Sequence, residues 1–262
     1  MRLGLKDSIV VNDRMVTSVP DIYAVGDAVQ VIQSVSGEDV LLSLAGPANR
    51  QGRIAADNIC GGDSRYRGSQ GSSIIKVFDM PAAVTGINEQ AAERAGIRAD
   101  KVYLSPASHA GYYPGARTMI MKVIYEKETC RLLGAQIVGY EGVDKQIDVL
   151  ATAISAGMTA TRLKDLDLAY APPYSSAKSP VNMAGFIIEN IADGRLKQFH
   201  WHEADTLPRD GSVTLLDVRT EQEYGAGHID GFCNIPLDEL RERIGELEQG
   251  KPVYAACQSG LR

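Results

Sequence analysis

The sequence predicts a chain in three parts, of which the middle part is α+β and the last part is α/β. Two stretches rich in glycine and polar residues, 68–73 and 194–211, separate the parts. In the middle part, strand and helix patterns follow one another without regular alternation, whereas a strand, a helix and a strand alternate at the end. We therefore expect domains at residues 1–72, 73–195 and 196–262.

The composition is that of a globular protein, with 44% hydrophobic and 23% charged residues in a chain of 262. The longest apolar runs, such as residues 184–188, are far shorter than the ~18 residues that a membrane span needs. The first residues carry no apolar segment of a secretory signal. The formal net charge of −6 disfavours a nucleic-acid surface. We expect a cytoplasmic protein that binds neither membrane nor nucleic acid.

The first part begins with a β-branched run at residues 9–11. A second apolar run at residues 22–25 has the pattern of a buried strand, which ends at Gly26-Asp27. Residues 48–59 have small side chains on one face and predict a helix, which the glycines at 61 and 62 end.

The middle part predicts strands, helices and one hairpin. Its expected elements are strands at 74–78 and around 102–104, a hairpin at 118–125 and 132–140, and helices at 88–95, 143–156 and 181–193. The last part predicts a strand at 213–218, a helix at 237–247 and a strand at 253–257.

Four cysteines are too few and too widely spaced for a disulfide framework, and no CxxC pair occurs. Cys60, Cys130 and Cys233 are expected to be small buried hydrophobic residues. His200 and His202 would share one face of a strand, but no third metal ligand is near in the sequence. We expect a solvated segment there and predict no metal site.

Two stretches resemble phosphate-binding loops, but neither fits a nucleotide site. Residues 245–251 fit GxxxxGK, but Pro252 replaces the hydroxyl residue that would bind magnesium. The glycines at 225, 227 and 231 have the wrong spacing for a dinucleotide loop. The sequence contains no GxGxxG, so it lacks a pyrophosphate-binding loop of that kind.

The strongest motif in the first part is Thr-Ser-Val-Pro-Asp-Ile-Tyr-Ala-Val-Gly-Asp at residues 17–27. An apolar strand that ends in Gly26-Asp27 presents a carboxylate at its end, where the glycine allows a ligand to approach the backbone. The string resembles the second FAD-binding motif of the pyridine-nucleotide–disulfide oxidoreductases. That resemblance implies that Asp27 binds the ribityl–phosphate part of FAD.

Residues 44–53, Leu-Ala-Gly-Pro-Ala-Asn-Arg-Gln-Gly-Arg, resemble the helix start beneath the flavin ring of that family. By this resemblance Leu44, Ala45 and Ala48 lie at the pyrimidine end of the ring. The free N–H groups and the positive end of the helix dipole would favour negative charge on a reduced flavin.

Residues 78–193 resemble the dimerisation domain of the same family. Residues 168–185 contain no histidine, although most disulfide reductases carry a catalytic His-Glu pair there. Together with Ser-His-Ala-Gly-Tyr-Tyr-Pro-Gly at 108–115, this stretch resembles the coenzyme A-disulfide reductase branch, including its persulfide- and polysulfide-reducing members. The resemblance implies that Tyr112 and Tyr170 stand near the reactive thiol of the partner subunit.

Tyrosine suits that role because a phenol with a pKa near ~10 can donate a hydrogen to a sulfur leaving group while it is uncharged at neutral pH. Tyr113 and Tyr174 are expected to be ordinary half-buried rings. Lys76, Arg117 and Lys178 could meet coenzyme A phosphates, and a solvated surface explains them equally well.

The last part carries a second, independent motif. Residues 215–236 resemble the opening of a rhodanese domain, and Cys-Gln-Ser-Gly-Leu-Arg at 257–262 matches the six-residue active loop CxxGxR. Successive backbone N–H groups after a strand can stabilise a thiolate or persulfide at Cys257. Gly260 would permit the tight turn, and Arg262 would add positive charge.

The resemblance implies an FAD-dependent, NAD(P)H-using reductase of coenzyme A disulfide, coenzyme A persulfide or polysulfide, coupled to rhodanese sulfur transfer. Coenzyme A would be substrate or bound ligand, and residues 73–195 would form a homodimer. The family's FAD fingerprint, redox cysteine and NADH domain would precede Met1, and its rhodanese domain would continue beyond Arg262. We therefore expect the chain to be a portion truncated at both ends that does not reduce disulfides alone.

Two other hypotheses stay open. The chain could be a non-redox module for dimerisation and sulfur transport that uses a Cys257 persulfide. It could also be a stranded fragment whose flavin and rhodanese parts are partly disordered, in which case only residues 78–193 would resist protease.

Overall fold

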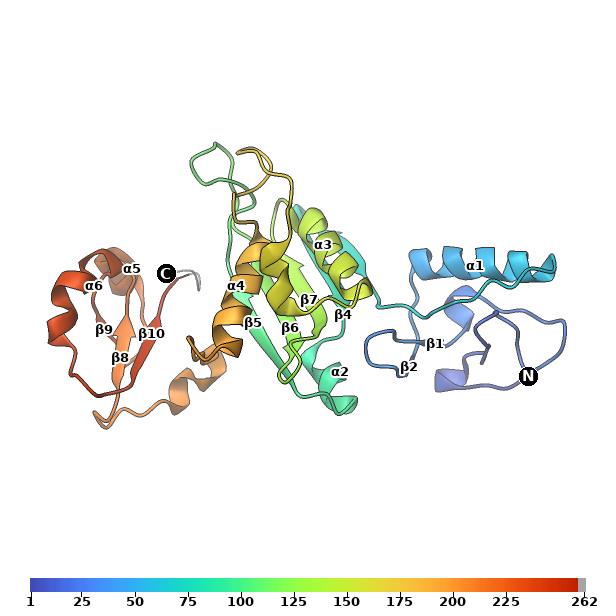
Figure 1. Ribbon diagram of the computed structural model, residues 1–262, viewed down its shortest axis with the longest axis horizontal. Helices are drawn as coiled ribbons and strands as arrows, with labels where there is room; N and C mark the ends of the chain where they lie inside the picture. Colours follow the sequence, from blue (N-terminus) through green and yellow to red (C-terminus); the bar gives the residue numbers. More distant parts are fainter. Residues whose placement is uncertain (259–262) are drawn as a thin grey trace.

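The fold is that of a computed structural model, which describes residues 1–258. Three parts follow one another along the long axis of Figure 1: an N-terminal part, a central sheet covered by helices, and a small C-terminal sheet. The predicted mixture of α+β and α/β architecture is confirmed, because the central sheet is antiparallel and the C-terminal sheet is parallel.

One long helix organises the N-terminal part. Its elements are the 3-10 helices Leu5–Asp7 (η1) and Gly26–Ala28 (η2), the strands Val31–Ile32 (β1) and Asp39–Val40 (β2), and the helix Ala45–Ile59 (α1). The predicted helix is confirmed, and it begins three residues earlier than expected.

The expected buried strand at residues 22–25 is wrong. Ile22 is exposed, and the segment pairs only through an isolated bridge between Val16 and Tyr23. Asp21 has a φ of 62°, so the chain turns sharply just before the apolar run. No neighbouring segment offers a continuous ladder, and apolar residues alone do not make a strand without one.

The central part is a five-stranded antiparallel sheet in the order β3-β4-β7-β6-β5, with helices α3 and α4 on one face. Its elements are β3 (Ser73–Val77), β4 (Met80–Gly86), α2 (Glu89–Arg94), β5 (Ala99–Leu104), β6 (Ile120–Glu126), β7 (Leu132–Val138), α3 (Val143–Ser155), η3 (Ala160–Asp165) and α4 (Pro180–Ala192). The main hydrophobic core lies between the sheet and these helices. The predicted hairpin and both long helices are confirmed.

Helix α4 is fixed at its start and in its middle. Ser179 and Asn182 form a capping box, and the Asn182 amide also donates to the carbonyl of Leu163 at 2.9 Å. A Cβ added at Gly185 would lie 2.3 Å from the backbone nitrogen of Lys164. Only glycine therefore allows α4 to pack this closely on η3.

The other face of the sheet stays open over much of its area. Ile75, Ala82, Val138 and Ile120 are paired in sequence across β3, β4, β7 and β6, so they form one row. Ile75 and Ile120 in this row are 61% and 59% exposed. An apolar row of this kind is unusual on a surface that faces only water.

Strand β4 was missed by the sequence patterns. Its sequence contains Pro81 and two alanines, which have low β-propensity, and it follows β3 after a turn of two residues at Phe78 and Asp79. The strand forms because β3 and β7 pair with it on both sides.

The C-terminal part is a parallel sheet in the order β10-β8-β9. Its elements are the 3-10 helix η4 (Trp201–Thr206), β8 (Thr214–Asp217), α5 (Glu221–Ala226), β9 (Cys233–Asn234), α6 (Leu237–Arg243), η5 (Ile244–Glu246) and β10 (Val253–Ala256). Both predicted strands are present. The predicted helix at 237–247 ends at Arg243 and continues as a 3-10 turn, and α5 and β9 were not foreseen.

The cysteine predictions are partly wrong. Cys60 and Cys233 are exposed, because one follows the end of α1 and the other lies in the short edge strand β9. Cys130 is half-buried, and burial raises the pKa of its thiol. Within residues 1–258, no helix is both long and apolar enough to cross a membrane.

Candidate functional site

The Gly26-Asp27 turn lies against helix α1. Gly26 has a φ of 74°, which strains any residue with a side chain, and its N–H donates to Oε1 of the buried Gln51 at 2.7 Å. A Cβ built on Gly26 would be 3.7 Å from the Cβ of Ala48. The turn therefore approaches the start of α1 closely, and it leaves Asp27 exposed.

The start of α1 is open to an anionic or acceptor-rich group. Leu44 is the N-cap, and no side chain hydrogen-bonds to the first turn. The N–H groups of Ala45 and Gly46 lie in this turn, where helix N–H groups lack partners within the helix. The positive end of the dipole of this 15-residue helix points to the same place.

Tyr112 and Tyr170 meet, although 58 positions separate them in the chain. Their hydroxyl oxygens are 3.0 Å apart, and the two side chains are 78% and 45% exposed. The hydrogen bond with Tyr112 raises the pKa of Tyr170 above its ordinary value. Both side chains face outward from the surface of the molecule.

Two loops carry this pair, and they hold each other in place. The N–H of Ala110 donates to the carbonyl of Ser175 at 3.0 Å, which joins the loop before β6 to the loop before α4. Buried His109 packs edge-on against the ring of Tyr113, with ring centroids 5.7 Å apart. Figure 1 shows both loops extending together beyond the sheet.

The basic residues expected near coenzyme A are exposed and spread over different elements. Lys76 lies on β3, and Lys178 precedes α4. Arg117 lies over the ring of Tyr140 at 5.7 Å from its centroid.

Cys257 directly follows β10 at the carboxyl end of the parallel sheet. It is half-buried and packs against the small core formed by Leu216, Val218 and Ile235. Ligand sites in open parallel sheets lie at this end of the strands. Gly260 and Arg262, the other residues of the predicted active loop, lie outside the described residues.

Asp217 and Arg219 form an ion pair beside Cys257 that sequence reasoning assigned no role. The Asp217 carboxylate is 1% exposed and accepts from both Nε and Nη2 of Arg219, at 3.0 and 2.7 Å. Burial opposes ionisation of Asp217, yet the hydrogen bonds from Arg219 hold its pKa below the ordinary value. Arg219 also reaches Oε1 of Gln258 at 3.4 Å.

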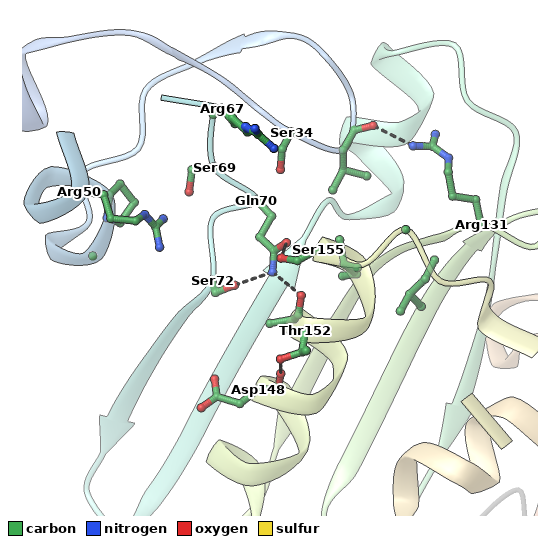
Figure 2. A pocket seen from close by; sticks show the side chains of 18 residues that line it. Ser34, Arg50, Arg67, Ser69, Gln70, Ser72, Arg131, Asp148, Thr152 and Ser155 are labelled. Atoms are coloured by element: carbon green, nitrogen blue, oxygen red, sulfur yellow. Dashed lines mark hydrogen bonds between the residues drawn. The ribbon is translucent and has the colours of Figure 1, made fainter. Parts of the chain in front are cut away.

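A polar cleft of about 890 Å³ lies between α1, the segment after it, and α3 (Figure 2). Gly46 and Pro47 from the start of α1 belong to its lining. Arg50 and Arg67 lie on one side of the cleft, across from Arg131.

The amide group of Gln70 joins the two sides of this cleft. It donates to the carbonyl of Ala151 and to Oγ1 of Thr85, both at 3.0 Å, and accepts from Oγ of Ser155 at 2.9 Å. This network attaches the N-terminal part to α3 and β4. Only the polar composition of residues 68–73 pointed to this network in the sequence.

His200 and His202 are stacked, with ring centroids 5.6 Å apart. The side chain of His200 is only 13% exposed, so the expectation of a solvated segment is wrong at this residue. In the part of the chain that the structure describes, no group of three histidine, cysteine or acidic residues could hold a metal ion.

Comparisons with known proteins agree on two domains. Residues 72–180 match the dimerisation domain of the pyridine nucleotide-disulphide oxidoreductases, and residues 200–262 match the rhodanese-like domain. The chain is 36% identical over 187 residues to a coenzyme A disulfide reductase of Staphylococcus aureus (strain bovine RF122 / ET3-1). That alignment covers 71% of this chain and 42% of the relative.

Two solved structures resemble nearly the whole chain. Reduced Bacillus anthracis CoADR-RHD is 48% identical, with a TM-score of 0.93. A NAD-dependent persulfide reductase from A. fulgidus is 39% identical, with a TM-score of 0.89. Each match covers 98% of this chain and 46% of the other, so the chain spans less than half the length of these relatives.

Proposed function

Because this chain belongs to the pyridine nucleotide-disulphide oxidoreductases and carries a rhodanese-like domain, we propose that its protein reduces sulfur–sulfur bonds and transfers sulfur. The substrates would be coenzyme A disulfide, coenzyme A persulfide or polysulfide, and the cofactors FAD and NAD(P)H. The observation that carries the proposal is the Tyr112–Tyr170 pair, which offers a proton donor where this sequence has no catalytic histidine.

The described residues fit an FAD molecule. Gly26 brings the backbone close to α1, Asp27 presents an exposed carboxylate that can accept from sugar hydroxyls, and the first turn of α1 has open N–H groups. Leu44, Ala45 and Ala48 would lie beside the flavin ring. When bound, FAD supplies the transfer of two electrons from the nicotinamide to the S–S bond.

The tyrosines would donate the protons that this reduction needs. Cleavage of an S–S bond by two electrons leaves sulfur anions, and each anion that departs as a thiol needs one proton. A phenol hydroxyl of the Tyr112–Tyr170 pair can donate it, and the 3.0 Å contact lets the second phenol stabilise the phenolate that remains. Water then returns the proton.

Cys257 would carry sulfane sulfur. Its thiolate attacks the outer sulfur of a persulfide, forms a Cys257 persulfide and displaces the donor as a thiolate, so no oxidant is needed. Backbone N–H groups after β10 and the charge of Arg262 would stabilise the anion. Arg219 would support this loop through its bond to Gln258.

The protein would be a homodimer through residues 73–195. The apolar row Ile75-Ala82-Val138-Ile120 on the open face of the sheet is the surface that a second copy would cover. Because Tyr112 and Tyr170 point outward, they would act at the reactive thiol of the partner subunit. We place the domain boundaries at residues 72/73 and 195/196, and we propose a cytoplasmic location.

The test is NADH consumption by the protein purified from its source cells, with coenzyme A disulfide or persulfide as acceptor. The 262-residue chain alone, which has no GxGxxG motif, serves as the comparison. We expect turnover by the former and none by the latter. Persulfide on Cys257 without any NADH-dependent reduction would overturn the reductase proposal in favour of a non-redox sulfur carrier.

A further inference from the structure

The segment between α4 and β8 contacts both of the domains that it connects. Residues 198–203, here called the brace, run beside β5, which is an edge strand of the central sheet. Successive side chains of an extended segment point to opposite sides. In residues 198–200, which precede η4, the side chains of Gln198 and His200 contact the dimerisation domain, and that of Phe199 contacts the rhodanese-like domain.

Gln198 and His200 face the dimerisation domain. Nε2 of Gln198 donates to the carbonyl of Lys101 on β5 at 2.8 Å. Nε2 of His200 lies 3.3 Å from Oδ1 of Asp100, and its ring packs edge-on against Tyr103 at 6.2 Å between centroids. Asp100 is itself only 20% exposed, so this contact is largely shielded from water.

Phe199, between these two residues, faces the rhodanese-like domain. Its ring packs edge-on against Tyr254 of β10, with centroids 5.8 Å apart. Phe199 also belongs to the small core around Leu207, Leu215 and Phe232. Tyr254 lies on β10, and Cys257 directly follows this strand, so the brace contacts the strand that positions Cys257.

The brace is also held within itself. The N–H of His200 donates to Oε2 of Glu203 at 2.6 Å, and the N–H of Glu203 donates back to the carbonyl of His200 at 2.8 Å. His202 stacks on His200. These bonds fix the turn by which the chain enters η4.

We infer that residues 198–203 are a rigid brace that holds β10, and with it Cys257, in one orientation relative to β5. The rhodanese-like domain is therefore fixed to the dimerisation domain and does not swing on a flexible tether. The inference rests on contacts alone, so it stands or falls independently of the proposed reductase activity.

Native cysteines provide a direct test by electron paramagnetic resonance. Cys60 and Cys233 are exposed and lie on opposite sides of the brace in the sequence. Both are spin-labelled in a Cys130→Ser, Cys257→Ser background, diluted with unlabelled protein so that distances within one chain are measured. We expect a narrow distance distribution that becomes several-fold broader in Gln198→Ala, His200→Ala.

Lys197→Ala is the matched control, because Lys197 is exposed and directly precedes the brace. It should leave the distribution narrow. Phe199→Ala, which removes only the contact with the rhodanese-like side, should broaden it and serves as second variant if the double variant fails to fold. The inference would be overturned if the distance distribution were already broad without substitutions in the brace. It would also be overturned if a folded variant that lacks the brace contacts kept the narrow distribution.

Discussion

The hydroxyl oxygens of Tyr112 and Tyr170 lie 3.0 Å apart on two loops that hydrogen-bond to each other. When one phenol of the pair donates its proton, the other can stabilise the remaining phenolate by a hydrogen bond. The loops expose the pair beyond the central sheet. Positions 58 residues apart thereby form one chemical unit.

Removal of either hydroxyl should slow reduction. We expect Tyr112→Phe and Tyr170→Phe each to lower the turnover of coenzyme A persulfide by about 10²-fold, because general acid catalysis contributes roughly 10²–10⁴-fold. The double variant should be little worse than either single variant, since the pair acts as a unit. Steady-state kinetics check this, with Tyr113→Phe as a control that should retain full activity.

A charge on the open face of the sheet should prevent dimerisation. Ile120→Asp or Val138→Asp places an uncompensated carboxylate in the apolar row, which costs several kcal/mol in a closed interface (~2–7 kcal/mol for an unpaired polar group). Sedimentation should show monomers at concentrations where the unsubstituted protein is dimeric. Ile59→Asp, at an exposed position on α1, should change nothing; a dimer that survives the first two changes would contradict the proposed interface.

Two glycines in helices should respond in opposite ways to alanine. Gly185→Ala forces a Cβ to 2.3 Å from the nitrogen of Lys164 and should destabilise the fold by about 1–3 kcal/mol. Gly52→Ala on α1 meets nothing within 4 Å and should stabilise by up to ~1 kcal/mol. Urea unfolding followed by circular dichroism measures both changes in the free energy of unfolding. If the two substitutions changed it equally, α4 would not pack closely on η3.

Acid should weaken the rhodanese-like domain through Asp217. Its folded-state pKa is depressed, so its stabilising contribution is present above the ordinary value of ~3.9 and is lost as the pH falls toward the folded-state pKa. Asp217→Asn should lower the free energy of unfolding by roughly 3–5 kcal/mol at pH 7, because it removes the buried carboxylate that pairs with Arg219. The difference in free energy of unfolding between Asp217→Asn and the unsubstituted protein should shrink below about pH 4.

Hydrogen exchange of the β8 amides at several pH values measures this effect. The exposed Asp230 offers the control, since Asp230→Asn should leave exchange of β8 unchanged throughout. If the difference in β8 exchange between Asp217→Asn and the unsubstituted protein stayed constant down to acid pH, the ion pair with Arg219 would not be the cause of the acid sensitivity.

The sequence predicted most elements whose burial follows a regular period. Helices α3 and α4 and the hairpin of β6 and β7 have apolar residues at the spacing of one buried face, so they could be located within a few residues. Strand β4 could not, because its place between β3 and β7 depends on long-range pairing and not on its own residues. The strand expected at residues 22–25 is wrong for the opposite reason, since the run has the apolar pattern but pairs through one isolated bridge and not through a continuous ladder.

Candidate site residues could be named from the sequence where a motif carries its chemistry locally. The Gly26-Asp27 turn and Cys257 each follow an apolar run, and their residue types indicate a role. The bond between Gln51 and Gly26 and the burial of His200 were not predictable, because both depend on segments brought together by the fold. Asp217 and Arg219 stand two residues apart at the end of a predicted strand, which is a signal that could have been used.

The proposed reductase activity is best tested by NADH consumption that depends on coenzyme A disulfide or persulfide, measured on the protein purified from its source cells. We expect saturable turnover with one equivalent of NADH for each S–S bond cleaved, and a large loss of turnover in Tyr112→Phe but not in Tyr113→Phe. No acceptor-dependent consumption of NADH by protein with bound FAD would contradict it.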